Sequence, residues 1–365
     1  MSQAPCALIM AGGTGGHIFP GLAVAEALRA DGWRVHWLGA PNSMEARLVP
    51  PRGFPLEPVQ FGGVRGKGVA TVALLPLRLL RAFWQSLSVV RRVRPDVVVG
   101  FGGYITFPGA MMGVLAGKPL VLHEQNSVAG MANRVLAGIA DRVFTAYPRA
   151  LPKGEWIGNP LRAAFVGQPE PRHRFEGRQG PLRVLVVGGS LGAQALNEVV
   201  PAALQRISPD ARPIVTHQSG EKQIDALRAA YAQAGVNATL TPFIDDTATA
   251  FAEADLVIAR AGASTVTELA AVGAAALLVP FPHAVDDHQT HNARFLVDAD
   301  AAWMVPQHAL TPDRLADWLQ DLQRDALLSR AEKARQLAKT DAVDSVVRAC
   351  RALAPQRHAP EGGAS

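Results

Sequence analysis

The chain repeats one local pattern, an apolar strand followed by a glycine turn and the start of a helix, once in each half. The first copy reads LIMAGGTGGH at residues 8–17, and the second reads VLVVGGSLGA at residues 184–193. Runs of Val, Ile and Leu that alternate with helical stretches are typical of parallel sheets covered by helices on both faces. We therefore expect an α/β fold of two doubly wound, Rossmann-like domains. Their glycine turns would lie at the carboxyl ends of strands, where such folds bind ligands.

The length of 365 residues fits two domains. A stretch at 148–181 is rich in Pro, Gly and charge and lacks clear periodicity, so we interpret it as the linker between them. Apolar runs predict strands on both sides of it, and amphipathic stretches predict helices such as those at 18–30 and 131–137. The predicted strands are 7–10, 34–38, 97–99, 120–122 and 142–145 before the linker, and 182–187, 214–217, 256–259 and 276–279 from its end onward.

Cysteine content and the apolar segments limit the cellular setting. Cys6 and Cys350 cannot form a disulfide framework, so a reduced, cytoplasmic environment is expected. No basic residue precedes the apolar run at 6–11, which argues against a signal peptide. The uncharged stretch at 97–117 is long enough to span a bilayer. Its glycines and prolines instead favour a strand, a glycine-rich turn and a helix start.

Positive charge is concentrated in one segment. The net charge is +5, yet the residues between Glu57 and Asp96 contain seven Lys and Arg side chains and no acid. Such a local excess favours an anionic surface or ligand at one place. Large apolar side chains crowd the second half of the segment, which therefore resembles a membrane-surface patch with a cationic rim. The patch residues that we predict are Leu74, Leu75, Arg78, Leu79, Arg81, Phe83 and Trp84.

Other interpretations of this segment stay open. It could be a core helix with a solvated basic edge, and Pro76 is expected to interrupt any single helix over 70–93. It could also make the protein a non-catalytic module that docks on an anionic membrane. Nucleic acid is not an expected partner, because the segment is aliphatic and lacks interleaved aromatic side chains for base stacking.

Glycine turns before helices suit phosphates, because free N–H groups and the helix dipole both favour anions. The first turn does not fit G-x-G-x-x-G, since Ile18 stands at the third glycine position, and no acid follows the second predicted strand. The sequence GVRGKG at 63–68 lacks the spacing and the Ser or Thr of a P-loop. NAD and P-loop ATP chemistry are therefore not expected. Tight strand–helix packing remains the structural alternative for each turn.

Two side chains near predicted helix starts have both a functional and a structural interpretation. At the first helix start, the positive end of the dipole favours a neutral His17 imidazole that can accept a proton near pH 7, or His17 merely packs there. Thr265 and Glu268 form a T-x-x-E pattern, which predicts a capping box. The Glu268 carboxylate would equally suit a ribose diol, with a phosphate on the same turn.

Metal ligation is not expected. His283, His288 and His291 lie close in sequence but have no supporting Cys and no HExxH spacing. The acidic pairs at 245–246 and 286–287 keep a site for a hard cation open.

Together these motifs closely resemble the MurG family of N-acetylglucosaminyltransferases, which make lipid II in bacterial peptidoglycan synthesis. The matching strings occur in family order and cover most of the chain, so the joint match is specific. They are GGTGGHIFPGLAVA at 12–25, GFGGY at 100–104, HEQN at 123–126, GNPLR at 158–162, GGSLGA at 188–193, RAGASTVTE at 260–268 and DHQ at 287–289.

The resemblance implies the GT-B fold, with an active site in the cleft between two domains. Residues 1–161 would form the acceptor-binding, membrane-facing domain, and residues 162–340 the domain that binds UDP-GlcNAc. A C-terminal helix at 341–355 would return to the first domain. The remaining residues, 356–365, are expected to be a disordered tail.

The resemblance also implies roles for individual residues in binding the donor. Its pyrophosphate would lie near Ser190 and the turn that begins at Ala263, its ribose on Glu268, and its uracil around Ile244 and Arg162. Gln289 and Asn126 would contact the sugar, and the first glycine turn would approach the phosphates of both substrates. The full set of implied donor-binding residues is Thr14, Gly15, Gly16, Asn126, Arg162, Ser190, Ile244, Ala263, Ser264, Thr265, Val266, Thr267, Glu268 and Gln289.

The implied reaction is an inverting transfer of GlcNAc from UDP-GlcNAc to the 4-hydroxyl of MurNAc in lipid I. We expect His17 to be the base, with Glu124 as the reserve candidate, and no cofactor or metal, because helix N-termini would stabilise the departing pyrophosphate. Expected partners are lipid I, the anionic inner-membrane surface and proteins of the cell-wall machinery. The protein would be peripheral, on the cytoplasmic face of the bacterial inner membrane.

Two departures from the family pattern limit what can be transferred. Thr106 and Phe107 replace smaller residues of some relatives, which affects the expected acceptor contacts. Thr290 stands where many relatives have a second Gln beside Gln289. The rival enzyme is a related GT-B transferase that glycosylates another membrane lipid, and a non-hydrolysing UDP-GlcNAc epimerase shares the architecture.

Overall fold

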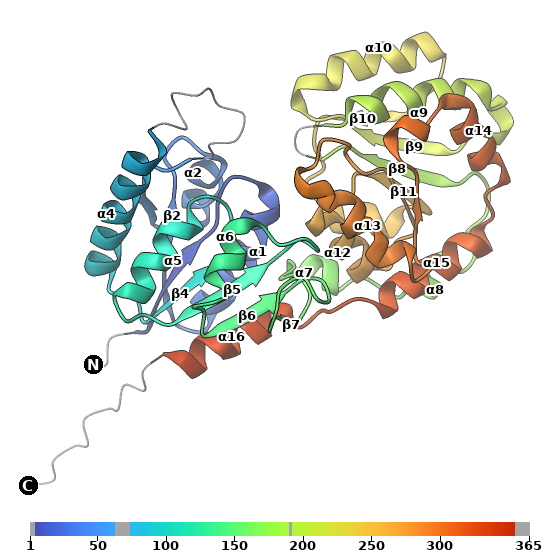
Figure 1. The fold of residues 1–365 in the computed structure, drawn as a ribbon. Coiled ribbons are helices and arrows are strands. Elements are labelled where there is room, and N and C mark those ends of the chain that lie inside the picture. Colours follow the sequence, from blue (N-terminus) through green and yellow to red (C-terminus); the bar gives the residue numbers. More distant parts are fainter. Residues whose placement is uncertain (1–3, 63–73, 190–191, 355–365) are drawn as a thin grey trace, which may run out of the picture. The chain divides into compact units, whose positions relative to one another are not determined.

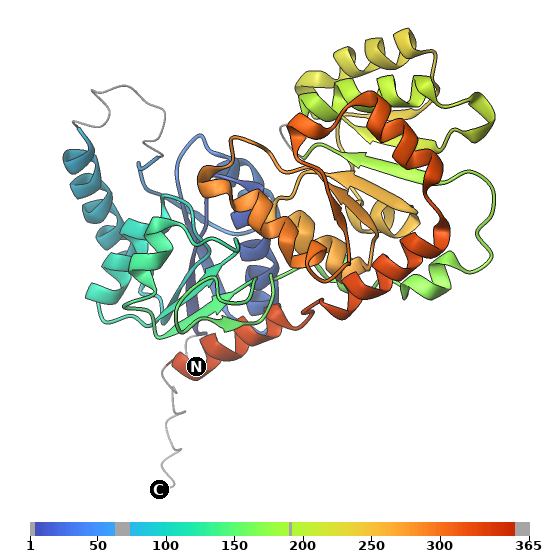
Figure 2. The same cartoon turned by 45° about the vertical axis from the view of Figure 1, so that its right-hand side comes forward.

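The computed structural model describes residues 4–62, 74–189 and 192–354. The chain divides into two compact units, each of which appears in Figure 1 and Figure 2 as a sheet with helices packed on it. The N-terminal unit comprises Met1–Leu161 together with Thr340–Ser365, and the C-terminal unit comprises Arg162–Lys339. Ser190, residues 63–73 of the basic segment, which include the GVRGKG sequence at 63–68, and the expected tail at 356–365 lie outside the described residues.

The N-terminal unit is built on a seven-stranded parallel sheet with the order β3-β2-β1-β4-β5-β6-β7. Because successive side chains of a strand point to opposite faces, Ala7 and Ile9 pack with one group of helices, while Leu8 and Met10 pack with another. The strands are β1 (Cys6–Met10), β2 (Arg34–Gly39), β3 (Leu56–Pro58), β4 (Val97–Gly100), β5 (Leu120–Glu124), β6 (Arg142–Thr145) and β7 (Glu155–Trp156).

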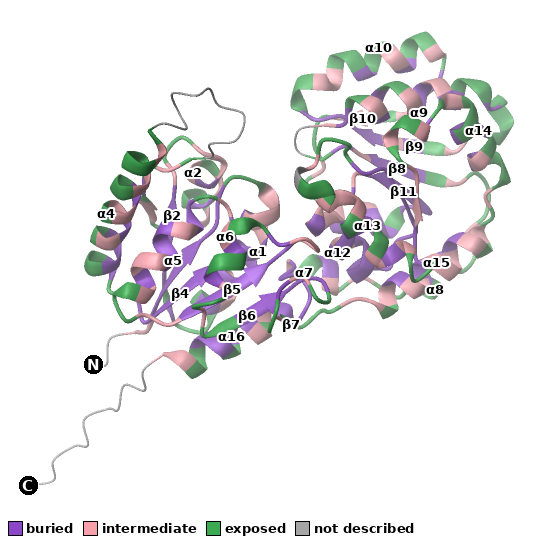
Figure 3. Ribbon diagram, in the orientation of Figure 1, coloured by how far each residue is buried: buried purple, intermediate pink, exposed green. Residues whose placement is uncertain are grey.

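The helices of this unit cover both faces of the sheet. One face is covered by α1 (Gly15–Ala30) and α16 (Ala342–Leu353), and the other by α4 (Leu75–Val93), α5 (Thr106–Leu115) and α6 (Met131–Leu136). Figure 3 shows the strands between them as largely buried. A short helix, α2 (Met44–Leu48), and the turn η1 (Pro50–Arg52) follow β2.

The C-terminal unit has a six-stranded parallel sheet with the order β10-β9-β8-β11-β12-β13. Its strands are β8 (Arg183–Val187), β9 (Ile214–Gln218), β10 (Thr239–Thr241), β11 (Leu256–Ala259), β12 (Ala276–Leu278) and β13 (Trp303–Met304). Its helices are α7 (Ala163–Val166), α8 (Pro171–Phe175), α9 (Gln194–Arg206), α10 (Ile224–Ala234), α11 (Thr247–Glu253), α12 (Ala263–Val272), α13 (His288–Val297), α14 (Pro312–Asp321) and α15 (Arg324–Gln336). Single turns are η2 (Pro209–Ala211), η3 (Glu221–Gln223), η4 (Val285–Asp287) and η5 (Gln307–Ala309).

In both units the strand order reverses beside the strand that carries the glycine turn. β1 lies between β2 and β4, and β8 lies between β9 and β11. The crevice outside the carboxyl ends of the strands at such a reversal is where doubly wound sheets bind ligands. The turns after β1 and β4 in one unit, and after β8 and β11 in the other, are therefore the candidate ligand-binding loops.

The predicted α/β architecture is confirmed, and each predicted strand is present with ends shifted by at most two residues. Sequence reasoning missed β3, β7, β10 and β13, which have only two or three residues each. The boundary between the two units falls between Leu161 and Arg162, within the predicted linker at 148–181, but the stretch is not irregular throughout, because β7, α7 and α8 lie in it.

The segment at 97–117 folds as predicted, with β4, a glycine turn and α5. No helix among the described residues is both long and apolar enough to cross a bilayer. The expected break at Pro76 does not occur. Pro76 is the second residue of the 19-residue helix α4, within the first turn, where a missing N–H costs nothing.

Candidate active site

In the N-terminal unit, the loops after β1 and β4 touch each other at glycines. A Cβ added to Gly103 would lie 2.3 Å from the carbonyl oxygen of Gly12, and Gly102 and Gly103 both have positive φ values, +92° and +87°. The hydroxyl of Thr106 donates to the carbonyls of Met10 and Gly102 at 3.0 and 2.7 Å. Thr106, the first departure from the family pattern, is therefore a buried residue whose hydroxyl links the two loops by hydrogen bonds.

His17 is the third residue of α1, the helix that follows the loop after β1. Its Nδ1 lies 3.1 Å from the carbonyl oxygen of Gly12 and 3.3 Å from the Thr14 hydroxyl. A carbonyl oxygen only accepts hydrogen bonds, so the neutral ring has its proton on Nδ1 and none on Nε2. A Cβ at Gly102 would lie 3.2 Å from that Nε2. The imidazole therefore directs a basic nitrogen towards the loop after β4.

Thr14, Gly15 and Gly16 form the start of the same helix. Thr14 is the N-cap residue but its side chain makes no capping hydrogen bond, and Gly15 and Gly16 are the first two helical residues. The first N–H groups of a helix have no partner within it, so they are available to an anion. The predicted helix start is thus present, and the phosphate contacts of these residues stay a prediction.

Glu124 ends β5 and is buried. One carboxylate oxygen accepts from the backbone and side-chain nitrogens of Asn126 at 2.8 and 3.3 Å. The other accepts from the Gly130 nitrogen at 3.3 Å and from Nδ2 of Asn133 at 2.8 Å. Four donors therefore bind the two carboxylate oxygens, and the carboxylate holds Asn126 and the start of α6 in place. Because its oxygens already accept these hydrogen bonds, Glu124 is poorly placed to accept a proton from a substrate. A Cβ at Gly102 would also lie 3.5 Å from the Asn133 amide, so Gly102 stands between His17 and the Glu124 cluster.

In the C-terminal unit, the turn after β11 leads directly into α12. The N-cap is Gly262, and residues Ala263, Ser264, Thr265, Val266, Thr267 and Glu268 are the first six helical residues. The capping-box interpretation of Thr265 and Glu268 is therefore wrong, because Thr265 lies inside the helix. Thr267 is buried and donates to the carbonyls of Ala263 and Ser264 at 3.0 and 2.9 Å.

Glu268 has an unusual carboxyl group. It is half-buried, and burial raises its pKa to about 7, an effect that the positive charge of Arg162 opposes only in part. The charge of Arg162 also contributes to the lowered pKa of Asp246, after the stronger hydrogen bonds from Thr249. Arg162, Glu268 and the 244–246 loop are thus close enough to interact within one unit. An acid with a shifted pKa beside a cation, here in the second turn of the helix that follows β11, is typical of a functional site.

Gln289 lies at the start of α13, where its Oε1 accepts from the Phe281 nitrogen at 2.9 Å. Thr290, the second departure from the family pattern, donates to Oδ1 of Asp287 at 2.7 Å. Its hydroxyl therefore fixes the turn before α13, and Gln289 keeps its Nε2 as a donor.

One residue of this unit was missed by sequence reasoning. Gln218 ends β9 and is buried, and its amide contacts Gly189 twice, accepting from the nitrogen at 3.2 Å and donating to the oxygen at 3.1 Å. The same Nε2 donates to the Pro242 carbonyl at 2.9 Å. Gln218 therefore joins the glycine turn after β8 to the loop that precedes Ile244. A glutamine at a strand end has no motif that would reveal this role.

The predicted surface patch on α4 is divided between two faces of the helix. Leu74, Leu77, Leu80 and Trp84 have exposed side chains, with 46%, 65%, 64% and 72% of their surface accessible. Arg78 and Arg81 lie among them and are exposed as well. Leu75, Leu79 and Phe83 are only half-exposed, and the Phe83 ring lies 6.1 Å from that of Phe107. Leu74, which was in the predicted set, directly precedes α4. On the helix itself the exposed apolar row is Leu77, Leu80 and Trp84, and two of these three were absent from the predicted set.

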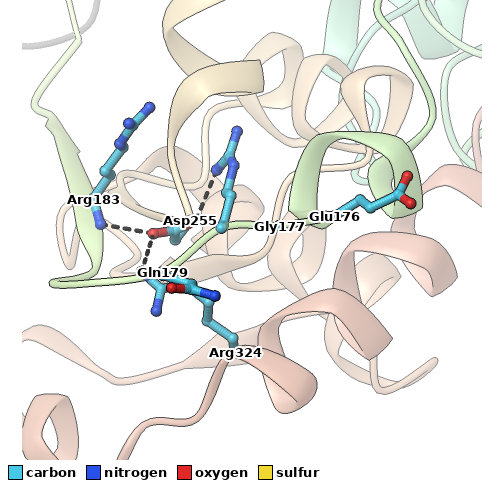
Figure 4. Close-up of a pocket in the computed structure, with 7 residues that line it drawn as sticks. Glu176, Gly177, Gln179, Arg183, Asp255 and Arg324 are labelled. Atoms are coloured by element: carbon cyan, nitrogen blue, oxygen red, sulfur yellow. Dashed lines mark hydrogen bonds and ion pairs between the residues drawn. The ribbon is translucent and has the colours of Figure 1, made fainter.

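A pocket of about 400 Å³ lies at the opposite, amino ends of the C-terminal sheet, lined by Arg178, Arg183, Asp255 and Arg324 among others (Figure 4). The Asp255 carboxylate is buried and accepts from Arg178 at 2.7 Å, from the Arg183 backbone at 2.8 Å and from Arg324 at 3.4 Å. Arg178 also binds the carbonyls of Ala252 and Glu253. These ion pairs and hydrogen bonds hold the segment after α8 in place, and they lie far from the glycine turns. Within the described ranges, no group of three or more His, Cys, Asp or Glu side chains could hold a metal ion.

Comparisons with known proteins cover both units. The glycosyltransferase family 28 N-terminal domain matches residues 7–145, and the glycosyltransferase family 28 C-terminal domain matches residues 183–347. A protein from Paracidovorax citrulli is 70% identical over 353 residues, which is 97% of this chain and 99% of its own. One from Polaromonas naphthalenivorans is 67% identical over 97% of this chain and all of its own length. Both are named UDP-N-acetylglucosamine–N-acetylmuramyl-(pentapeptide) pyrophosphoryl-undecaprenol N-acetylglucosamine transferase.

Solved structures agree with these relatives. The crystal structure of Acinetobacter baumannii MurG has a TM-score of 0.82 and 41% identity, and covers 95% of this chain and 99% of its own. The glycosyltransferase of kitacinnamycin has a TM-score of 0.70 at 18% identity over 97% of this chain and all of its own, so the likeness concerns the fold alone.

Proposed function

Because this chain belongs to the MurG family of glycosyltransferases, we propose how its own residues carry out the family's reaction on the GT-B fold. The reaction transfers GlcNAc from UDP-GlcNAc to the MurNAc of lipid I and gives lipid II and UDP. The chain is thus a hexosyltransferase of peptidoglycan synthesis. What remains to be assigned is which side chains bind each substrate and which one takes the proton.

His17 is the base in this proposal. The observation that carries it is the 3.1 Å contact between Nδ1 and the Gly12 carbonyl, which leaves Nε2 as the proton acceptor. Nε2 takes the proton of the MurNAc 4-hydroxyl while that oxygen attacks the anomeric carbon, and the bond to UDP breaks with inversion. The N–H groups at the start of α1 and α12 stabilise phosphate charge on the acceptor and on the leaving UDP.

Glu124 is assigned a positioning role instead. Its two oxygens already accept four hydrogen bonds, and two of the donors belong to Asn126. Glu124 would therefore hold the Asn126 amide in the orientation that the GlcNAc group requires. Losing such a support typically costs activity through geometry.

Donor recognition falls to the C-terminal unit. Glu268 binds the ribose hydroxyls, Arg162 and the Ile244 loop border the uracil, and Gln289 donates its Nε2 to a sugar hydroxyl. Gly188 and Gly189 after β8, Ser190, which lies outside the described residues, and the helix start at Ala263–Thr267 hold the pyrophosphate. Support comes from the pKa of about 7 of the Glu268 carboxyl, from the proximity of Arg162, and from the position of the turns after β8 and β11 at the strand-order reversal.

The exposed row Leu77, Leu80 and Trp84, with Arg78 and Arg81, would contact the anionic inner-membrane surface from the cytoplasmic side. An apolar row rimmed by arginines combines hydrophobic insertion with attraction to anionic lipid. Lipid I lies in such a surface, so docking would bring the enzyme to its acceptor. Proteins of the cell-wall machinery are further proposed partners.

The deciding experiment measures transfer of labelled GlcNAc to a short-chain lipid I analogue in EDTA, with wild type and His17→Gln. We expect the wild type to be active in EDTA and the variant to lose kcat by roughly a hundredfold or more, as for loss of a general base, with UDP-GlcNAc affinity unchanged. Wild-type kcat in the variant would remove His17 as the base. Loss of wild-type activity in EDTA, restored by a divalent cation, would refute the metal-free mechanism.

A further inference from the structure

Glu45 is a buried carboxylate at the first glycine turn, and no motif in the sequence points to it. It is the second residue of α2, which Ser43 caps by accepting from the Ala46 nitrogen at 3.2 Å. The side chain is only 1% exposed. Burying a carboxylate is costly unless its oxygens accept hydrogen bonds, so the partners of Glu45 indicate its role.

Both oxygens of Glu45 accept backbone N–H groups, one from each of two loops. Oε2 accepts from the Gly13 nitrogen at 3.1 Å, and Oε1 accepts from the Ala40 nitrogen at 3.0 Å. Gly13 belongs to the loop after β1, and Ala40 directly follows β2. One side chain therefore fixes the positions of two adjacent strand-end loops.

The fit around this carboxylate is tight. A Cβ at Gly12 would lie 2.6 Å from Oε1 of Glu45, and a Cβ at Gly39 would lie 2.8 Å from its Cγ. Gly13 has a φ of +87°, a conformation that L side chains rarely adopt. The glycines at 12, 13 and 39 thus allow the carboxylate to approach the backbone closely.

The peptide that Glu45 holds is the one that orients His17. The Gly12 carbonyl and the Gly13 N–H belong to the same planar peptide unit, so they point in opposite directions. Glu45 fixes the N–H side, and the carbonyl side lies 3.1 Å from Nδ1 of His17. If this peptide rotated, Nδ1 would lose its carbonyl acceptor. The Thr14 hydroxyl at 3.3 Å would remain, but a hydroxyl can donate or accept, so the tautomer of the ring would no longer be fixed.

We propose that Glu45 is a positioning residue for proton removal: by holding the peptide between Gly12 and Gly13, it keeps the His17 proton on Nδ1 and leaves Nε2 to accept the proton of the acceptor hydroxyl. This inference rests on the proposed role of His17 as base. Glu45 itself touches no substrate in this proposal and takes part in no bond change.

The test uses the full chain with Glu45→Gln and Glu45→Asp. Gln keeps one acceptor but turns an NH₂ group towards the other N–H, and Asp keeps the charge but is one methylene too short to reach both loops. Asp96→Asn is the matched control, because Asp96 is also buried and accepts a backbone N–H, that of Cys6, at 2.8 Å. Asp96 precedes β4, at the opposite end of the sheet from the glycine turns.

Three quantities are measured: the ¹⁵N shifts of the His17 ring with labelled histidine, assigned with His17→Gln; kcat and its pH profile; and the Kd for UDP-GlcNAc. We expect both Glu45 variants to lower kcat by roughly tenfold to a hundredfold. They should also shift the His17 ring from the Nδ1–H form to a mixture of tautomers. The Kd for UDP-GlcNAc should change less than about twofold, since the donor is proposed to bind mainly to the C-terminal unit, and Asp96→Asn should keep the wild-type tautomer and kcat.

An unchanged tautomer and kcat in the Glu45 variants would overturn the proposal, as would an equal loss of kcat in Asp96→Asn. A failure of the base assignment gives a different pattern. In that case His17→Gln keeps its activity, while the ring spectrum still reports whether Glu45 sets the tautomer.

Discussion

Two glutamates of this chain show how surroundings decide what a carboxylate can do. Glu124 accepts four hydrogen bonds and holds a loop in place. Glu268 lies on α12 and has a pKa raised to about 7 by burial, with Arg162 as its nearby charge. The sequence analysis gave Glu124 as the reserve base and Glu268 as the ribose ligand, but it could not predict their surroundings, because burial and the number of hydrogen-bond donors depend on distant parts of the chain.

Glu268→Gln should weaken UDP binding by roughly tenfold to a hundredfold at pH 8, the usual effect of losing a hydrogen bond to a charged group. The wild-type carboxyl loses its proton as the pH rises through about 7, so wild-type affinity should increase between pH 6 and pH 8. The variant has no such group and should lose this increase. Calorimetric titration at both pH values tests this, and an increase that persists in the variant would contradict the ribose assignment.

His217 makes the stability of the C-terminal unit depend on pH. It is buried between the Tyr231 hydroxyl and Oδ1 of Asn197, both at 3.0 Å, and burial lowers its pKa from 6.5 to about 3. A folded pKa below the unfolded one means that the unfolded chain binds the proton first. The stabilisation is complete above pH 6.5 and is lost as the pH falls towards 3.

We therefore expect the His217 contribution to the free energy of unfolding of this unit to fall by about 2 kcal/mol between pH 7 and pH 5, on the basis of about 1.4 kcal/mol per pKa unit. In His217→Gln this fall should be absent. Denaturant unfolding of both proteins at the two pH values measures the difference. The difference between the two proteins cancels the contribution of Glu268, whose raised pKa changes the free energy of unfolding in the opposite direction. Equal changes of this free energy with pH in both proteins would rule His217 out as the cause.

At the scale of single elements, α4 shows how far an amphipathic sequence pattern predicts which residues of a helix are exposed. The sequence indicated an apolar, basic surface, but three of the five predicted apolar residues, Leu75, Leu79 and Phe83, lie on the half-buried side of the helix. The starting point of the helix decides which residues face outward, and Pro76 at its second position sets that start. The strands were easier to predict because a buried parallel strand needs only a continuous apolar run.

Leu77→Glu combined with Leu80→Glu should reduce binding to vesicles that contain anionic phospholipid by at least tenfold. The double variant replaces two apolar side chains that would be buried in the bilayer, each contributing about 2 kcal/mol when fully buried. It also adds two negative charges, which the anionic surface repels. Co-sedimentation with vesicles measures this. Ile214→Glu is the matched control, since Ile214 is 59% exposed in the C-terminal unit. An equal loss in the control, or none in the double variant, would refute the α4 surface.

For the whole molecule, the two units follow the same construction, each with a glycine turn at the strand-order reversal. Sequence reasoning predicted this because both turns carry local motifs. It did not predict Glu45 and Gln218, each of which ties two strand-end loops together. Such ties join residues far apart in the chain, and single polar residues leave no periodic signal.

The last helix, α16, belongs to the N-terminal unit, where Val346 and Cys350 are fully buried beside α1. Val346→Asp should lower the free energy of unfolding of that unit by about 3 kcal/mol or more, because it buries an unpaired charge. Arg348→Asp, at an exposed position of the same helix, is the control and should change it by less than about 0.5 kcal/mol. Hydrogen exchange resolved by unit tests this, and equal effects would contradict the packing role.

This placement of α16 also bears on how the protein is made. A ribosome synthesises the first 161 residues of the N-terminal unit, then the whole C-terminal unit, and only afterwards the helix that completes the first core. The unit begun first is therefore completed only after the C-terminal unit has been made, and the face of its sheet that α16 covers stays accessible to chaperones until α16 itself has been synthesised.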